Sequence, residues 1–177
     1  MIQCPRGAVF FVPFLRRHNG GKSRKGWFIM EAMTKAQAKA LSPTTLAFYG
    51  DCVYEGMVRR KIVSEGSRPS NELHKRSVEW VRASFQAAAY ETLLPLLSEE
   101  ESEILKRGRN ATGLKAPRSS NPAEYHRATA VEALFGYLSL IGEEARLETL
   151  FAAILEKSGL TGNLGGKDLS VHEKKTD

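Results

Sequence analysis

The stretch LAFYGDCVYEGMVRR, residues 46–60, places an aspartate directly after a glycine within the apolar face of a predicted helix. Apolar side chains recur at steps of three and four residues, which is the spacing of one helix face. They are Leu46, Tyr49, Val53, Met57 and Val58. The pattern predicts a helix that runs on to a stop near Gly66. It leaves Asp51 near the core, where a carboxylate needs a partner.

The chain on either side of this stretch is also predicted to be helical, from residue 34 to residue 157. A long helix is expected to begin at Ser70 or Asn71 and to end about Pro95. Ser98 and Glu101 form a capping box at the start of the next helix. Two further helices are predicted over residues 123–142 and 143–157. No strand alternation occurs in the segment, so the sequence predicts an all-α helical bundle in one domain.

The two ends of the chain differ from this segment. Residues 1–30 contain six Lys or Arg and no Asp or Glu, whereas the remainder holds 20 of each charge, so the net charge of +6 lies entirely in the N-terminal part. We expect residues 1–33 to be a disordered extension, or to precede a true start at Met30 or Met33, with a transit peptide as the alternative. Residues 158–177 are expected to form a flexible tail. No apolar run approaches the length of a membrane span.

A second carboxylate lies in the predicted helix over residues 123–142. Small or polar residues recur along it at steps of three and four: Thr129, Glu132, Gly136 and Ser139. If this stripe packed against Gly50, Asp51 and Glu132 would lie side by side, and a hard divalent cation such as Mg²⁺ would relieve their repulsion. The alternative is structural, with Asp51 bonding locally and Glu132 meeting Arg82 or Arg127. From the residues alone both hypotheses stay open.

Glu55 follows Asp51 by one helical turn and has a simpler explanation. It lies four residues before Arg59, so the two side chains can form an ion pair along the helix surface.

A cationic segment without acids lies between Ile104 and Pro122. It contains Lys106, Arg107, Arg109, Lys115 and Arg118, around Asn110 and two glycines. Arginine forks, lysines and an asparagine amide suit a phosphate backbone, so the segment is a candidate RNA-binding loop. A solvated loop whose first cations complete a helix dipole is the alternative.

Four motifs, in this order, resemble the Mini-ribonuclease III family: LAFYGDCVYEGMVRR, NELHKRS, LKRGRNA and ATAVEALFGYL. The resemblance covers residues 41–157. It implies a ribonuclease III-type helical domain that acts as a homodimer and cleaves double-stranded RNA with Mg²⁺. It also implies that Asp51 and Glu132 are the catalytic, metal-binding carboxylates, that Phe48 packs into the partner subunit, and that the cationic segment reaches the RNA.

The resemblance further implies maturation of the 23S ribosomal RNA precursor, often with a large-subunit ribosomal protein. It covers bacterial and plastid proteins alike, and the unconvincing leader favours a bacterial cytoplasm over a plastid. Ala47 and Thr129 stand where the wider ribonuclease III signature has acids, a difference shared by the Mini group. With fewer protein oxygens, cation binding without RNA is expected to be weak. Two alternatives have other functions: a catalytically inactive RNA-binding or ribosome-assembly module of the same fold, and a helical protein-interaction domain.

Overall fold

A computed structural model describes residues 31–112, 116 and 121–160, and within these residues it contains helices and no strands. The helices are α1 (Lys35–Ala40), α2 (Pro43–Ser64), α3 (Ser70–Val81), α4 (Ala83–Leu93), the short 3-10 helix η1 (Leu94–Leu96), α5 (Glu99–Arg109), α6 (Pro122–Leu140) and α7 (Glu144–Lys157). This confirms the all-α prediction. The predictions for residues 1–33 and 158–177 concern segments that lie largely outside the described residues.

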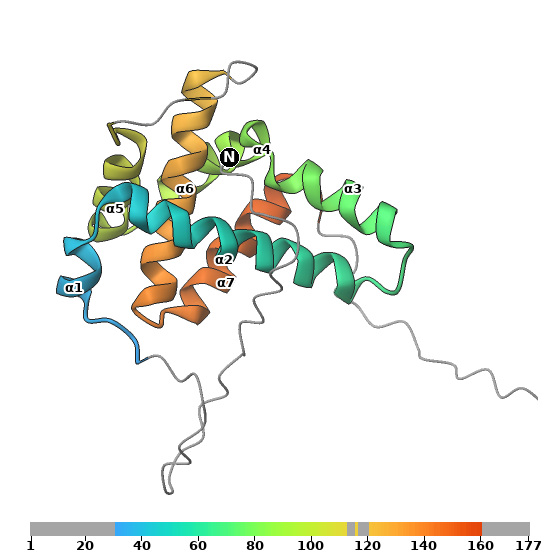
Figure 1. Cartoon of the computed structure of the whole chain (residues 1–177), viewed down its shortest axis with the longest axis horizontal. Helices are drawn as coiled ribbons and strands as arrows, with labels where there is room; N and C mark the ends of the chain where they lie inside the picture. Colours follow the sequence, from blue (N-terminus) through green and yellow to red (C-terminus); the bar gives the residue numbers. More distant parts are fainter. Residues whose placement is uncertain (1–30, 113–115, 117–120, 161–177) are drawn as a thin grey trace, which may run out of the picture.

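Helix α6 forms the centre of the domain. It is buried on every side from Ala128 to Leu138 except at Glu132, as expected for a helix with apolar residues around its whole circumference. Helices α2, α4, α5 and α7 all pack against it. In Figure 1, α2 crosses α6, with α1 and α5 near one end of α2 and α3 beside the other end. The crossing of α2 and α6 therefore joins the two segments that carry the candidate acids.

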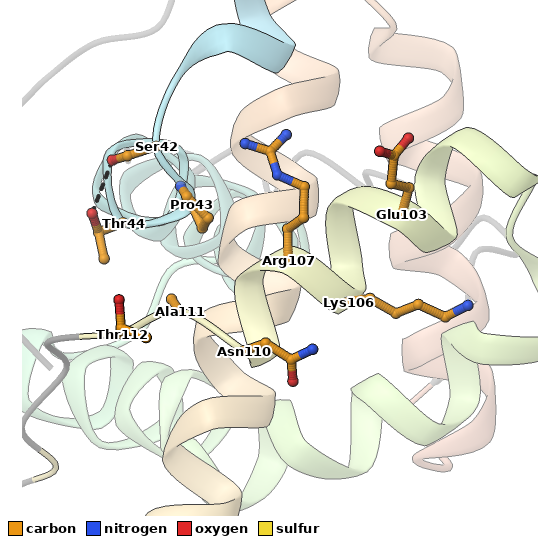
Figure 2. A pocket seen from close by; sticks show the side chains of 9 residues that line it. All are labelled: Ser42, Pro43, Thr44, Glu103, Lys106, Arg107, Asn110, Ala111 and Thr112. Carbon is orange, nitrogen blue, oxygen red and sulfur yellow. Dashed lines mark hydrogen bonds between the residues drawn. The ribbon is translucent and has the colours of Figure 1, made fainter.

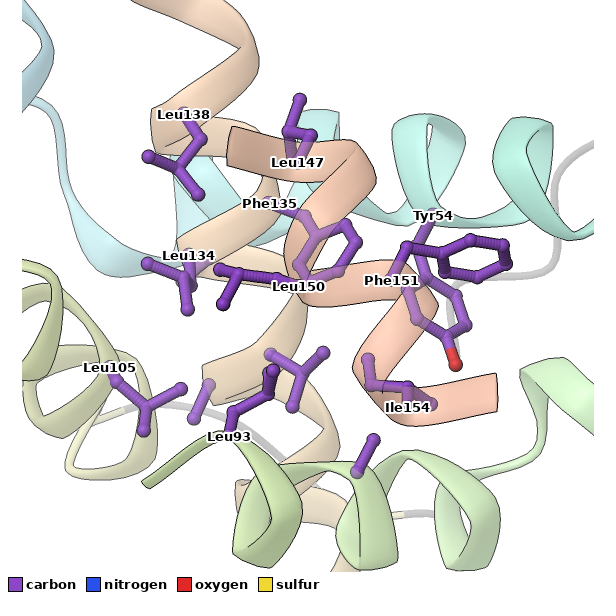
Figure 3. Close-up of a cluster of buried hydrophobic side chains, with 14 of the residues drawn as sticks. Tyr54, Leu93, Leu105, Leu134, Phe135, Leu138, Leu147, Leu150, Phe151 and Ile154 are labelled. Atoms are coloured by element: carbon purple, nitrogen blue, oxygen red, sulfur yellow. The ribbon is translucent and has the colours of Figure 1, made fainter. Parts of the chain in front are cut away.

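Aromatic rings fill the space between α2, α6 and α7. The Tyr54 ring packs edge to face against Phe135 and Phe151, with ring centroids 5.3 Å and 5.9 Å away. Leucine and isoleucine side chains from α4, α5, α6 and α7 extend this cluster (Figure 3). The burial of these side chains supplies the main driving force for folding and fixes α6 relative to its neighbours.

The predicted long helix over residues 70–95 is wrong in one respect, because the structure breaks it in two. Arg82 adopts an extended backbone (φ −65°, ψ 148°), which ends α3 and begins α4. The break lets α3 follow α2 while α4 turns to pack on α6. A continuous helix could not make both contacts, so tertiary packing overrides the local helical pattern.

Two predicted helix boundaries are confirmed. Helix α2 ends at Ser64, and Gly66 follows with φ 119°, a left-handed conformation that favours glycine. Ser98 caps α5: its hydroxyl accepts from the Glu101 amide (3.3 Å), while the Glu101 carboxylate accepts from the Ser98 amide (2.8 Å). Among the described helices, none is both long and apolar enough to span a membrane.

Candidate functional site

Two glycines bring the backbones of α2 and α6 into direct contact. A Cβ atom on Gly50 would lie 1.7 Å from the carbonyl oxygen of Glu132, and one on Gly136 would lie 2.1 Å from the carbonyl oxygen of Leu46. Both distances are far below van der Waals contact, so neither position has room for a side chain. Beside this contact, the Tyr49 hydroxyl lies 3.3 Å from the Ser139 hydroxyl. The packing of the two small-residue stripes, predicted from sequence, is therefore observed.

The crossing sets Asp51 and Glu132 beside each other as a partly buried pair of like charges. Burial, and then the charge of Asp51, raise the pKa of Glu132 to about 8. Burial, and then the charge of Glu55, raise the pKa of Asp51. The charge of Asp51 thus acts on Glu132, whereas the charge that acts on Asp51 is that of Glu55, one helical turn further along α2.

Ion pairs do not explain the two carboxylates. Within the described part of the chain, no ion pair involves Asp51 or Glu132; Arg127, suggested as a partner of Glu132, instead pairs with Glu91 at 3.3 Å. Glu55 and Arg59 form the predicted pair, with 2.5 Å between carboxylate and guanidinium. Asp51 and Glu132 thus differ from Glu55, because among the described residues no cationic side chain forms an ion pair with either of them.

The pair suits a hard divalent cation. Carboxylate oxygens are the ligands that Mg²⁺ prefers, and two carboxylates with several waters form a common Mg²⁺ shell. Among the described residues there is no group of three or more His, Cys, Asp or Glu side chains that could enclose a metal ion. Water and substrate would therefore have to supply most of the ligands. The residues present fit a cation that stays exposed to solvent and substrate.

Two polar side chains beside Glu132 are ones that sequence analysis missed. Gln86 of α4 is 1% exposed and Tyr54 of α2 is fully buried, and neither the Nε2 atom of Gln86 nor the hydroxyl of Tyr54 has a hydrogen-bond partner in the described structure. Gln86 interacts with the Glu132 carboxylate, and the charge of Glu132 acts on Tyr54. The sequence signal that could have revealed Gln86 is its position on the same helical face as Tyr90 and Leu93, which are buried.

The cationic segment contains side chains of two kinds. Lys106 and Asn110 are exposed at the end of α5 and line a surface pocket of about 460 Å³ beside the start of α2. Arg107 is half-buried, and its guanidinium donates to the carbonyl oxygens of Lys39 and Leu41, each at 3.0 Å. In Figure 2 the Lys106 and Arg107 side chains leave α5 in different directions. Arg107 therefore holds the connection between α1 and α2.

The other residues predicted to bind RNA or a partner subunit do not lie together in one cluster of the described structure. Arg109 is exposed and donates to the Tyr90 hydroxyl and the Asn110 side chain, both at 3.4 Å. Lys115 and Arg118 lie outside the described residues. Phe48 is 66% exposed on α2, one turn before Asp51. An aromatic ring this exposed is the surface that a partner subunit would cover, and its place in a dimer interface stays a prediction.

Comparisons with known proteins agree on one family. The family model described as the Ribonuclease III domain matches residues 44–143. The Mini-ribonuclease 3 of Symbiobacterium thermophilum is 43% identical over 121 residues, which cover 68% of this chain and 93% of the relative. That of Thermoanaerobacter sp. is 44% identical over 120 residues, covering 68% and 84%. The crystal structure of a Fusobacterium nucleatum protein matches with a TM-score of 0.61 and 30% identity, over 67% of this chain and 96% of that one.

Proposed function

Because this chain belongs to the ribonuclease III family, in its Mini-ribonuclease III group, and is an endoribonuclease, we propose that it cleaves double-stranded RNA with Mg²⁺ held by Asp51 and Glu132. The observation that carries the proposal is the glycine contact between α2 and α6. It keeps two partly buried carboxylates together without a cationic side chain to neutralise them. Such a pair is costly in a purely structural role.

The two carboxylates have different tasks in this proposal. A bound Mg²⁺ would supply Lewis acidity at the phosphate and a water of lowered pKa. Asp51 would supply one carboxylate ligand. Glu132, whose pKa is raised to about 8, must release its proton before both of its oxygens can act as ligands. The backbone contact at Gly50 keeps the two side chains at a fixed spacing.

RNA binding is proposed to involve the exposed members of the cationic segment. Lys106 and Asn110 face solvent, and Arg109 keeps donors free beside its two long contacts. Lys115 and Arg118 belong to the same proposal, although they lie outside the described residues. A homodimer that forms through Phe48 would double these contacts and place two sites along one duplex. Binding should then depend strongly on salt and weakly on sequence.

The cellular role is proposed from the family alone. We assign residues 34–157 as the catalytic domain, and propose that it matures the 23S ribosomal RNA precursor in the cytoplasm, in the presence of a large-subunit ribosomal protein. The stalk formed by the two ends of that precursor is a duplex, which is the substrate class that the proposed site requires. Comparison of precursor ends in cells with and without the protein would test this role.

A catalytically inactive RNA-binding or ribosome-assembly module of the same fold is the second candidate. A pure binder would gain nothing from two neighbouring acids, of which Glu132 has its pKa raised by burial and then by the charge of Asp51. The retained carboxylate pair therefore favours the enzyme.

Cleavage of a long labelled RNA duplex tests the proposal directly. Wild-type protein should cleave with Mg²⁺ and not without it, and Asp51→Asn and Glu132→Gln should each lose cleavage while still binding the duplex. Glu79→Gln is the matched control, because Glu79 is an exposed acid on α3 with no ion pair among the described residues. Retained cleavage in both site variants would exclude the two-carboxylate mechanism, and duplex binding without cleavage by the wild type would support the binding module.

A further inference from the structure

Gln86 is a buried amide that lacks a hydrogen-bond partner. Its side chain is 1% exposed, and its Nε2 atom has no partner among the described residues. Leaving a buried N–H group unpaired costs roughly 1–3 kcal/mol. Native proteins rarely retain such a group unless it serves a function or meets its partner in another state. The unpaired Nε2 atom of Gln86 therefore calls for a partner in another state of the protein.

The acceptor available to this amide is the Glu132 carboxylate. Helix α4, which carries Gln86, packs against α6, which carries Glu132. The Gln86 side chain acts on Glu132 as a hydrogen-bonding neighbour, although the contact falls short of ordinary hydrogen-bond geometry. An amide N–H can only donate, and a carboxylate oxygen accepts most strongly when it is ionised. A small movement of either side chain would complete the bond.

Tyr54 of α2 provides a second unpaired donor. Its hydroxyl is buried without a partner, and burial, followed by the charge of Glu132, raises the pKa of Tyr54. The ring is held edge-on by Phe135 and Phe151, so it has little freedom to follow the carboxylate (Figure 3). Gln86 has three rotatable side-chain bonds and can follow it. Of the two donors, Gln86 is the one able to adjust.

We propose that Gln86 is a positioning residue that donates a hydrogen bond from Nε2 to one oxygen of Glu132 and thereby keeps the other oxygen directed toward Asp51. The inference rests on the proposed function, because the carboxylate must be held in place only where it binds a cation. Residues that orient a metal-binding carboxylate typically change metal affinity by about 10- to 100-fold when they are removed. Gln86 contacts neither cation nor substrate, so its effect passes through Glu132.

The substitution Gln86→Met tests this role, since methionine has nearly the same shape and no donor. Removal of an unpaired buried amide should leave the stability of the metal-free protein unchanged or slightly higher. At the same time, the Mg²⁺ concentration for half-maximal cleavage should rise about tenfold. The rise in melting temperature on addition of Mg²⁺ should shrink in parallel, which provides a measurement independent of activity.

Thr92→Val is the matched control on the same helix. The Thr92 hydroxyl donates only to the Ala88 carbonyl of its own helix, at 3.1 Å. This variant loses a polar group from α4 without affecting Glu132, so both its half-maximal Mg²⁺ concentration and its Mg²⁺-induced rise in melting temperature should match the wild type.

The possible outcomes separate this inference from the proposed function. A Gln86→Met protein with wild-type Mg²⁺ dependence, whatever its metal-free stability, would overturn the positioning role and leave the two-carboxylate site intact. Cleavage by the wild type without any divalent cation would overturn both. A higher Mg²⁺ concentration for half-maximal cleavage together with unchanged or higher metal-free stability is the result that a purely structural glutamine would not produce.

Discussion

The backbone of Gly50 lies directly against the backbone of Glu132, with room for a hydrogen atom but not for a methyl group between them. Together with the contact of Gly136 against Leu46, it sets the distance between α2 and α6 and, with it, the spacing of the two candidate catalytic acids. A carboxylate pair on helices that were separated by ordinary side chains would stand several ångströms further apart.

Gly50→Ala should therefore be strongly destabilising. Its Cβ would lie 1.7 Å from the Glu132 carbonyl oxygen, a backbone atom that can move only with α6. We expect a loss of about 3 kcal/mol or more in the free energy of unfolding, measured with urea. Gly56→Ala on the same helix meets nothing within 4 Å and should stabilise the protein by roughly 0.5–1 kcal/mol. Equal effects of the two substitutions would contradict the close contact.

The stability of the metal-free protein should fall as pH rises. The pKa of Glu132 is raised from 4.5 to about 8, first by burial and then by Asp51. A raised pKa means that the unfolded chain releases this proton more readily, so the contribution to stability is complete below pH 4.5 and is lost as pH rises toward and through 8. The loss should be on the order of 5 kcal/mol once the pH exceeds 8.

The isosteric variant Glu132→Gln removes this titration. Measured by urea unfolding without divalent cations, it should match the wild type in acid and exceed it in stability at alkaline pH. Parallel stability curves for the two proteins across the whole pH range would argue against a buried, proton-holding Glu132.

Adjacent cations of α5 should respond differently to substitution. Lys106→Ala removes an exposed charge, so it should weaken duplex binding several-fold and reduce the salt dependence by about one phosphate contact per subunit. Arg107→Ala should instead cost about 2 kcal/mol in the free energy of unfolding, because the Lys39 and Leu41 carbonyls lose their donors. Binding titrations at several salt concentrations and urea unfolding would distinguish the two roles; a stable Arg107→Ala protein with weak binding would reverse this assignment.

Phe48 should control assembly rather than folding. Because 66% of its surface is exposed, Phe48→Ala removes few contacts within the subunit, and helical content and unfolding should change little. Sedimentation or light scattering should show a shift from dimer to monomer. Val63→Ala, at a position on the same helix that is 61% exposed, serves as the control and should leave the dimer intact. A Phe48→Ala protein with wild-type mass in solution would remove Phe48 from the interface.

The sequence predicted the close contact between α2 and α6 better than it predicted the neighbouring secondary structure. Gly50 and the stripe containing Gly136 were visible because small residues at helical spacing have one main structural use, close helix packing. The break at Arg82 was not visible, since both flanking segments favour helix and only their separate packing on α2 and α6 requires it. Arg107 resembled its cationic neighbours, because the carbonyl groups that it contacts lie more than sixty residues away in sequence.

Because its pKa is raised to about 8, Glu132 offers a way to measure how much of the site is filled by a cation. A divalent cation that binds to both carboxylates must displace the proton of Glu132, which is released into solution. Addition of a divalent salt to a weakly buffered solution should therefore acidify it in proportion to the sites filled. The heat of binding should likewise vary with the ionisation enthalpy of the buffer. Occupancy of the site could then be counted without RNA and without turnover.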